Sequence, residues 1–237
     1  MKYEKVVKGK FVARPNRFIA EVEIDGKCVR AHVKNTGRCS ELLIPGAKVY
    51  LEDWEGRMAK RKLRYSLICV EKKTDRGVLL VNMDSQAPNK VVKESLEEGS
   101  LVLPGVDHDT VIKPEAVYGD SRIDFKLEAK DGLEAYIEVK GVTLESDGEA
   151  SFPDAPTERG IKHLKELEKA VADGKKAFAV FVIQMEGMKT FSPNDRKHKA
   201  FGEALRNAAS KGVRILAYEC FVRPDELKLS RQVSVKL

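Results

Sequence analysis

The sequence is poor in the residues that build zinc knuckles and disulfide frameworks. Its 237 residues include only four cysteines, scattered without a C-x-x-C pair: Cys28, Cys39, Cys69 and Cys220. Neither a zinc-ligand spacing nor a disulfide framework is predicted, and the thiols are expected to be reduced. No apolar run approaches the ~20 residues of a membrane span, and the N-terminal segment MKYEKVVKGKFV lacks the apolar stretch of a secretory signal. We therefore expect a cytoplasmic protein that does not associate with membranes.

A Gly-rich phosphate loop is also missing from the sequence. This absence disfavours an enzyme that acts on a small phosphorylated or sugar ligand, and we predict no small organic cofactor. Hydrophobic residues make up 42% of the chain and charged residues 34%, which excludes a disordered or collagen-like chain. The length allows one large domain or two small ones. The oligomeric state stays open.

Positive charge is concentrated in the first third of the chain. Residues 1–85 hold 19 Lys and Arg against 11 Asp and Glu, whereas residues 86–237 hold 24 against 26. The densest run is Lys60-Arg61-Lys62-Leu63-Arg64-Tyr65. A basic surface on one domain indicates an acidic polymer as partner, most commonly nucleic acid. The alternative is a solvated Lys/Arg-rich turn.

The first 84 residues have the pattern of a small β-barrel. Apolar residues alternate or cluster at period two over residues 11–13, 18–24, 28–33, 49–51 and 67–70. Asp25-Gly26 is a hairpin signal, and further turns are expected at residues 35–38 and 45–46. Five short strands with a basic bias predict a barrel of the oligonucleotide-binding (OB) type over residues 1–84.

The period changes after residue 84, which predicts a second domain over residues 85–237. Helices are expected near residues 85–99, at 157–173 with Thr157 as N-cap, and at 195–210 with Asn194 or Asp195 as N-cap. Strands are expected at 110–118, 121–128, 133–140, 177–183 and 213–219. This order predicts an α/β domain with a mixed sheet, and an α+β protein overall.

The most specific chemical feature lies in the hairpin of residues 121–140. Period two places Glu138 and Lys140 on the same face of one strand, with Val139 directed into the core. Asp124 lies on the neighbouring strand, and the Asp131-Gly132 turn would bring it opposite or diagonal to Glu138. Two carboxylates this close repel each other, and binding a hard divalent ion relieves the repulsion.

Oxygen ligands without His or Cys favour Mg²⁺ or Mn²⁺ over zinc. Such an ion would hold a phosphate oxygen and activate a water molecule, while Lys140 would stabilise the growing charge. The sequence thus predicts phosphodiester hydrolysis by Asp124, Glu138 and Lys140, with Asp124, Glu138 and Glu115 as metal ligands. The alternative is that Glu138 and Lys140 form an exposed ion pair, worth ~0–1 kcal/mol.

Several long runs match a known family over nearly the whole chain. They are Ser121-Arg122-Ile123-Asp124-Phe125, Ile137-Glu138-Val139-Lys140-Gly141-Val142-Thr143-Leu144, Phe152-Pro153-Asp154-Ala155, Thr157-Glu158-Arg159-Gly160 with His163-Leu164, and, near the front, Arg17-Phe18 and Asn35-Thr36-Gly37. In these runs the chain resembles the sugar fermentation stimulation protein A (SfsA) family. The resemblance implies an N-terminal OB barrel, a C-terminal PD-(D/E)XK nuclease-like domain, DNA-binding activity and a link to sugar (maltose) utilisation.

The resemblance also implies roles for single residues. Asp124 matches the metal-binding Asp of the nuclease pattern, Glu138 its second acid and Lys140 its lysine. Glu115 matches an additional acid less well, because it precedes a predicted strand and is not clearly inside a helix. Arg159 and His163 lie four apart on one helix face. In related folds this helix borders the site, so Arg159 could hold a phosphate and His163 could donate a hydrogen bond to it; the alternative is an ordinary surface helix.

The basic residues of the first domain are candidates for contacts to DNA phosphates. They are Arg14, Arg17, Arg38, Lys60, Arg61, Lys62 and Arg64, with Phe18, Trp54 or Tyr65 as possible stacking partners. No recognition helix is evident, so largely sequence-nonspecific binding is expected. A non-catalytic DNA-binding regulator is the alternative to a nuclease. A preference for single-stranded, duplex or branched DNA stays open.

Overall fold

The computed structural model describes residues 1–35, 37–107 and 109–237. Thr36, in the turn expected at residues 35–38 and in one of the family-like runs, lies outside the described residues. The chain divides into two compact units. Unit 1 comprises Met1–Ala87, Gln184–Glu186 and Cys220–Lys228, and unit 2 comprises Pro88–Ile183, Gly187–Glu219 and Leu229–Leu237. The domain division at residue 84 remains a prediction, and the structure adds that unit 1 includes two later segments of the chain.

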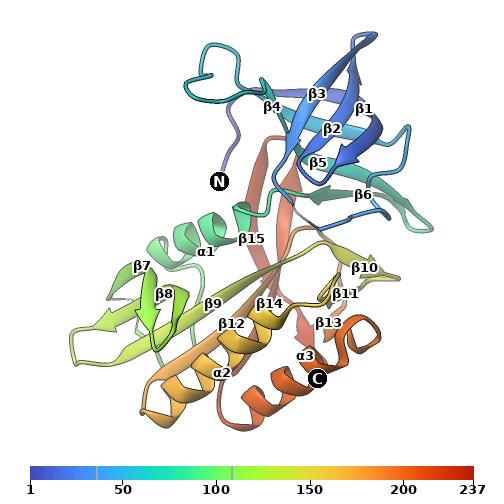
Figure 1. Ribbon diagram of the computed structural model, residues 1–237. Helices are drawn as coiled ribbons and strands as arrows, with labels where there is room; N and C mark the ends of the chain where they lie inside the picture. Colours follow the sequence, from blue (N-terminus) through green and yellow to red (C-terminus); the bar gives the residue numbers. More distant parts are fainter. Residues whose placement is uncertain (36, 108) are drawn as a thin grey trace. The chain divides into compact units, whose positions relative to one another are not determined.

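Unit 1 contains a closed β-barrel (Figure 1). Its strands are β1 (Val6–Asn16), β2 (Ile19–Ile24), β3 (Lys27–Val33), β4 (Lys48–Asp53), β5 (Tyr65–Thr74) and β6 (Gly77–Asn82). They are ordered β3-β2-β1-β4-β5-β6, and an additional β3–β5 pairing closes the first five into a barrel. The predicted small barrel is therefore confirmed, and β6 is a further strand that the sequence pattern did not predict.

The β2–β3 hairpin shows why the sequence forms this barrel. Ala20, Val22, Ala31 and Val33 are at most 1% exposed, and each alternates with a more accessible residue. Period-two alternation buries one face of the hairpin in the barrel. The turn residues Asp25 and Gly26 have φ values of 50° and 76°, as a two-residue type I′ turn requires. The predicted hairpin at this site is confirmed.

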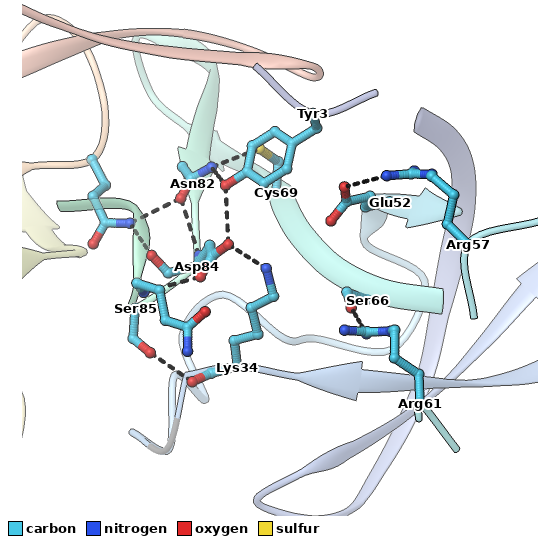
Figure 2. A network of polar contacts seen from close by, with 12 residues as sticks. Tyr3, Lys34, Glu52, Arg57, Arg61, Ser66, Cys69, Asn82, Asp84 and Ser85 are labelled. Carbon is cyan, nitrogen blue, oxygen red and sulfur yellow. Dashed lines mark hydrogen bonds and ion pairs between the residues drawn. The ribbon is translucent and has the colours of Figure 1, made fainter. Parts of the chain in front are cut away.

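A buried polar network lies within unit 1 (Figure 2). The Asp84 carboxylate is fully buried and accepts hydrogen bonds from Lys34 Nζ at 2.6 Å and from the Tyr3 hydroxyl at 3.3 Å. Asn82 donates to the Tyr3 hydroxyl at 3.0 Å, and Gln184 donates to Asn82 Oδ1 at 2.9 Å. Buried polar groups without partners are costly, so Gln184 completes a network whose other members all lie within residues 3–84.

Unit 2 contains most of a mixed sheet ordered β15-β14-β12-β9-β8-β7; the end of β14 and the start of β15 belong to unit 1. Its strands are β7 (Thr110–Tyr118), β8 (Ser121–Ala129), β9 (Glu134–Val142), β12 (Lys176–Ile183), β14 (Arg214–Arg223) and β15 (Glu226–Gln232). Strands β7, β8 and β9 pair antiparallel, whereas β9, β12 and β14 pair parallel. The predicted mixed sheet is confirmed, and β9 lies in its interior.

Three helices complete unit 2: α1 (Ala87–Glu97), α2 (Glu158–Ala172) and α3 (Asp195–Ser210). Helix α2 packs on β8, β9 and β12 and against α3 (Figure 1). Thr157 caps α2 as predicted, because its Oγ1 accepts from the Gly160 amide at 3.1 Å. Asn194 is the N-cap of α3 by position, but its side chain donates to the Pro153 carbonyl at 3.2 Å instead of capping. None of the helices in the described part of the chain is long and apolar enough to cross a membrane.

A second, small sheet in unit 2 was not predicted. It is ordered β10-β11-β13-β16 and contains β10 (Leu144–Ser146), β11 (Glu149–Phe152), β13 (Thr190–Pro193) and β16 (Ser234–Val235). Each strand has only two to four residues. Segments this short have no measurable period, so their pairing depends on tertiary contacts.

Candidate active site

The hairpin β8–β9 brings Asp124 and Glu138 side by side. Phe125 pairs with Ile137, and continuing that register by one residue sets Asp124 beside Glu138. The ladder changes at this point, because Asp124 Oδ2 accepts from the Val139 amide at 2.8 Å. The two carboxylates that the sequence placed on adjacent strands are thus neighbours in the structure.

A residue that the sequence analysis missed holds the other oxygen of Asp124. Asn89, in the first turn of α1, donates through Nδ2 to Asp124 Oδ1 at 2.8 Å. Both Asp124 oxygens therefore accept a hydrogen bond, which fixes the plane of the carboxylate. No motif in the sequence connects Asn89 with a position 35 residues later.

Glu138 is the most buried acid of the site, with 3% of its surface exposed. Its Oε1 atom contacts both Lys140 Nζ and His163 Nδ1. Its Oε2 atom is buried and has no hydrogen-bond partner among the described residues. An unpartnered carboxylate oxygen is costly in the protein interior, so Oε2 is a vacant acceptor for a cation or a hydrogen-bond donor.

The tautomer of His163 follows from its two contacts. Arg159 Nε, which can only donate, lies 3.3 Å from His163 Nε2. In this contact Nε2 is therefore the acceptor, which leaves Nδ1 to carry the proton directed at Glu138. The His163 side chain is only 7% exposed.

These contacts place His163 differently from the sequence-based expectation of a hydrogen bond to a phosphate. Both ring nitrogens are occupied within the protein, so the structure places His163 to orient Glu138. Arg159 is exposed, and its contact with a phosphate remains a prediction. The shared face of α2 was the signal for the Arg159–His163 pair, but the sequence gave no sign of its contact with Glu138.

The two carboxylates have pKa values shifted in opposite directions. Burial raises the pKa of Asp124, and the negative charge of Glu138 raises it further. Burial alone would also raise the pKa of Glu138. The hydrogen bond from His163 and the charge of Lys140 outweigh burial and hold this pKa below its usual range. The site therefore favours ionisation of Glu138 more than ionisation of Asp124, and a bound cation would favour the ionised form of both.

The residues present fit a hard divalent cation. They offer two adjacent carboxylates and a buried, unpartnered oxygen at Glu138 Oε2, and oxygen is the ligand type that Mg²⁺ and Mn²⁺ prefer. Among the described residues, however, no group of three or more His, Cys, Asp or Glu side chains is arranged to hold a metal. The protein thus supplies two acidic ligands at this point, and the remaining coordination positions would fall to water or substrate.

Glu115 does not join the carboxylate pair. It lies within β7, its side chain is 71% exposed, and it forms an ion pair with Arg122 at 3.0 Å. The sequence analysis grouped Glu115 with Asp124 and Glu138 as a metal ligand. The structure corrects this grouping, because the carboxylate of Glu115 is directed to an exposed arginine on the neighbouring strand.

In unit 1, Arg14 is used to hold a loop. Its guanidinium donates at 2.6–2.8 Å to four backbone carbonyls, those of Arg17, Asn35, Gly37 and Arg38. Such a group stabilises the turn that follows β3 and has few donors left for a phosphate. The structure therefore assigns Arg14 to the loop and not to the exposed basic surface on which the sequence analysis placed it.

Arg64 and Arg61 are also engaged within unit 1. Arg64 forms a two-point contact with Asp53 at 2.7 and 2.8 Å, and Arg61 donates to Ser66 and lies 4.2 Å from the centre of the Trp54 ring. The exposed members of the predicted basic set are Arg17, Arg38, Lys60 and Lys62. The two lysines are thus the clearest candidates for contacts to phosphates in the 60–64 run.

Comparison with known proteins accounts for both units. Residues 86–226 match the family model described as the sugar fermentation stimulation protein RE (restriction endonuclease-like) domain, and residues 12–81 match the SfsA N-terminal OB domain. These matches confirm the predicted fold class: an OB barrel followed by a nuclease-like α/β domain with a mixed sheet.

Relatives match over their full length. The chain is 52% identical over 237 residues to a sugar fermentation stimulation protein homolog from Desulfitobacterium hafniense, covering 100% of this chain and 99% of the relative. It is 50% identical to the homolog from Clostridium beijerinckii, covering 100% of both chains. The structure of Pyrococcus furiosus SfsA in complex with Ca²⁺ superposes with a TM-score of 0.86 at 29% identity, covering 100% of this chain and 98% of that one. The chain belongs to the sugar fermentation stimulation protein A (SfsA) family.

Proposed function

We propose that this protein binds DNA and hydrolyses phosphodiester bonds in unit 2, using Mg²⁺ or Mn²⁺ held by Asp124 and Glu138. The observation that carries the proposal is the pair of adjacent carboxylates. In this pair Glu138 Oε1 contacts the Lys140 ammonium, and the buried Oε2 has no hydrogen-bond partner among the described residues. Acids with perturbed pKa values and a cation at the same point are a common signature of a functional site. Glu115 has no part in the proposal.

Each side chain of the site has a defined task in this reaction. Asp124 and Glu138 hold the cation, and Asn89 and His163 fix the orientation of these two carboxylates. When bound, the metal ion supplies Lewis-acid chemistry and lowers the pKa of a coordinated water. Lys140 places a positive charge beside the reacting phosphate, where it stabilises negative charge that develops in the transition state.

The relative from Pyrococcus furiosus supports a hard divalent cation. Its structure was determined in complex with Ca²⁺. Ca²⁺ takes oxygen ligands and is more tolerant of geometry than Mg²⁺. A site that accepts Ca²⁺ in a relative of the same fold is consistent with an oxygen-ligated cation at Asp124 and Glu138 in this chain.

Charge supports DNA as the substrate. The exposed residues Arg17, Arg38, Lys60 and Lys62 lie in the unit that carries the positive excess of the chain. Contacts between such side chains and phosphates position nucleic acid without reading its bases. The binding is accordingly proposed to be largely sequence-nonspecific, and Arg159 is proposed to contact a phosphate beside the catalytic centre.

A non-catalytic DNA-binding regulator of sugar (maltose) utilisation is the second candidate. One observation favours it: three of the four carboxylate oxygens of Asp124 and Glu138 already accept bonds within the protein. A pair stabilised in this way could be retained for its structural role. The two candidates differ in whether DNA is cleaved.

Two measurements test the proposal. Purified protein is incubated with labelled single-stranded, duplex, flap and junction DNA in Mg²⁺, Mn²⁺ or chelator, and metal-dependent cleavage is expected for at least one substrate. Calorimetric titration with Mn²⁺ should show a site that Asp124→Asn abolishes. The exposed Asp120→Asn serves as the matched control and should keep the site. If the protein binds DNA but cleaves none of the substrates, the non-catalytic regulator is the remaining candidate. If wild type, Asp124→Asn and Asp120→Asn take up equal amounts of metal, the two carboxylates have only a structural role.

A further inference from the structure

Unit 1 has a groove on the outer face of its β2–β3 hairpin. The groove has a volume of about 500 Å³ and is lined by Ile19, Arg30, His32, Arg61, Lys62 and Leu63. We propose that this groove binds an unpaired nucleobase of single-stranded DNA. The inference rests on the DNA binding proposed above and gives it a preferred form of substrate.

Side chains of the β2–β3 hairpin form the floor of the groove. Ile19 pairs with His32, and Arg30 lies two residues before His32 on β3. Residues two apart on a strand share a face, so these three side chains project together from the outer side of the barrel. The intervening Ala20 and Ala31 are fully buried in the barrel interior.

Residues 61–63 form the second wall. Arg61 is anchored in two ways, because it donates to Ser66 (Figure 2) and stacks on Trp54. These contacts restrict the side chain before any ligand arrives. A wall that is already ordered saves the entropy that binding would otherwise cost. Leu63 adds an apolar side chain to this wall.

The chemistry of the groove matches a nucleotide. Ile19 and Leu63 offer apolar surface, whereas Arg30, Arg61 and Lys62 add positive charge. Burial lowers the pKa of His32, and the nearby charges of Arg61 and Lys34 lower it further, so its imidazole is neutral at neutral pH. A nucleobase has a flat apolar face and polar edges, and its flanking phosphates are anionic. An apolar surface with a cationic margin is complementary to that combination.

An exposed aromatic residue lies next to a groove residue in the sequence. Phe18 directly precedes Ile19, its side chain is 44% exposed, and the Arg17 guanidinium lies 4.7 Å from the ring centre. Single-strand binding proteins combine such stacking surfaces with basic side chains. Bases in a duplex are stacked on each other and cannot enter the groove, so the occupant must be unpaired.

The test separates base contacts from phosphate contacts. Fluorescence anisotropy is measured in chelator with three labelled probes: a homothymidine strand, an abasic strand of the same length, and a duplex. The abasic strand keeps the phosphates but has no bases. Wild-type protein should bind the thymidine strand about tenfold or more tightly than the abasic strand, because stacking one base contributes ~1–3 kcal/mol.

Variants test whether the difference in affinity between the thymidine strand and the abasic strand depends on the groove. Leu63→Ala and Ile19→Ala should each reduce the preference for thymidine over abasic DNA towards one. Val78→Ala removes an exposed apolar side chain of β6 outside the groove and should leave the preference unchanged. Two groove variants on different elements guard against a folding defect in either one.

The outcomes distinguish the groove from the wider proposal. Equal, salt-sensitive binding of the thymidine and abasic strands would contradict base binding in the groove, but it would still support nonspecific DNA binding. Tighter binding of duplex than of single strand would likewise overturn it. Failure to bind any probe at low salt would overturn the proposed DNA binding itself, and the groove with it.

Discussion

The Nδ1 atom of His163 contacts Oε1 of Glu138, and the Nε2 atom of the same ring accepts from Arg159. The orientation of the buried Glu138 carboxylate is therefore set by a helix that follows the hairpin in sequence. A fixed imidazole tautomer directs its proton at one carboxylate oxygen, and Glu138 Oε2 has no hydrogen-bond partner in the part of the chain that the structure describes. A side chain that orients a metal-ligating residue through a hydrogen bond is typical of metal sites.

The first prediction concerns the contact between His163 and Glu138. His163→Ala should weaken Mn²⁺ binding by about tenfold, the lower end of the range for a residue that orients a metal ligand. His198→Ala is the matched control, because His198 lies in the same unit and contacts Thr157 and Glu158. Calorimetric titration of both variants checks the prediction. Unchanged affinity in His163→Ala would mean that Lys140 and the backbone alone orient Glu138.

The second prediction separates metal binding from catalysis at Lys140. Lys140→Met should keep the metal site and reduce DNA affinity only slightly, since one cation among many phosphate contacts contributes little to ground-state binding. Its cleavage rate should fall by about 10²-fold or more, because a positioned charge acts mainly on the transition state. Glu138→Gln should also lose cleavage, and raised Mn²⁺ should rescue it in part. Equal rates for wild type and Lys140→Met would point to a different active site or a contaminating nuclease.

The third prediction tests the exposed lysines of unit 1. Replacing Lys60 and Lys62 together by Gln should weaken binding of all DNA sequences alike. Each lost phosphate contact should reduce the log–log slope of affinity against salt by ~0.9 on duplex or ~0.7 on single strands. The double variant of Lys27 and Lys73, two exposed lysines of the same unit, serves as the control. A slope that does not change in the first variant would remove these lysines from the interface.

The fourth prediction concerns stability and pH. The two-point contact with Arg64 holds the pKa of Asp53 well below its usual range, although burial opposes the shift. The folded state then binds fewer protons than the unfolded chain, so this contribution is present above pH ~4 and is lost as pH falls. Asp53→Asn should lower stability at pH 7 by ~2 kcal/mol, the scale of charged hydrogen bonds. Thermal unfolding at several pH values checks this, and the gap between wild type and variant should narrow below pH ~4; a gap that stays constant would contradict the assignment.

Local pattern was sufficient to predict the hairpin of the candidate site. Alternating apolar residues around Asp124 and Glu138 define two strands, and Asp131-Gly132 defines the turn between them. Those features fix which residues face each other. The adjacency of the two carboxylates was therefore predictable before any tertiary contact was known.

Contacts made by other elements were not predictable in the same way. Asn89 reaches Asp124 from α1, and His163 reaches Glu138 from α2. The sequence analysis treated Arg14 and Arg64 as candidates for contacts to DNA phosphates. In the structure, Arg14 contacts loop carbonyls and Arg64 contacts a buried aspartate. Such pairings join distant segments and have no period or spacing that a single sequence reveals.

The return of the chain to unit 1 limits how this protein can be divided or recombined. A fragment that ends near residue 84 keeps Asn82 but lacks Gln184, whose amide donates both to Asn82 Oδ1 and to the Asp84 carbonyl. It also lacks Cys220–Lys228, including the residues that bond to Tyr3 and Met1. Unit 1 is therefore encoded in three separated stretches of the gene. A crossover that replaced the second half of the chain would also exchange part of unit 1, so the two units are inherited together.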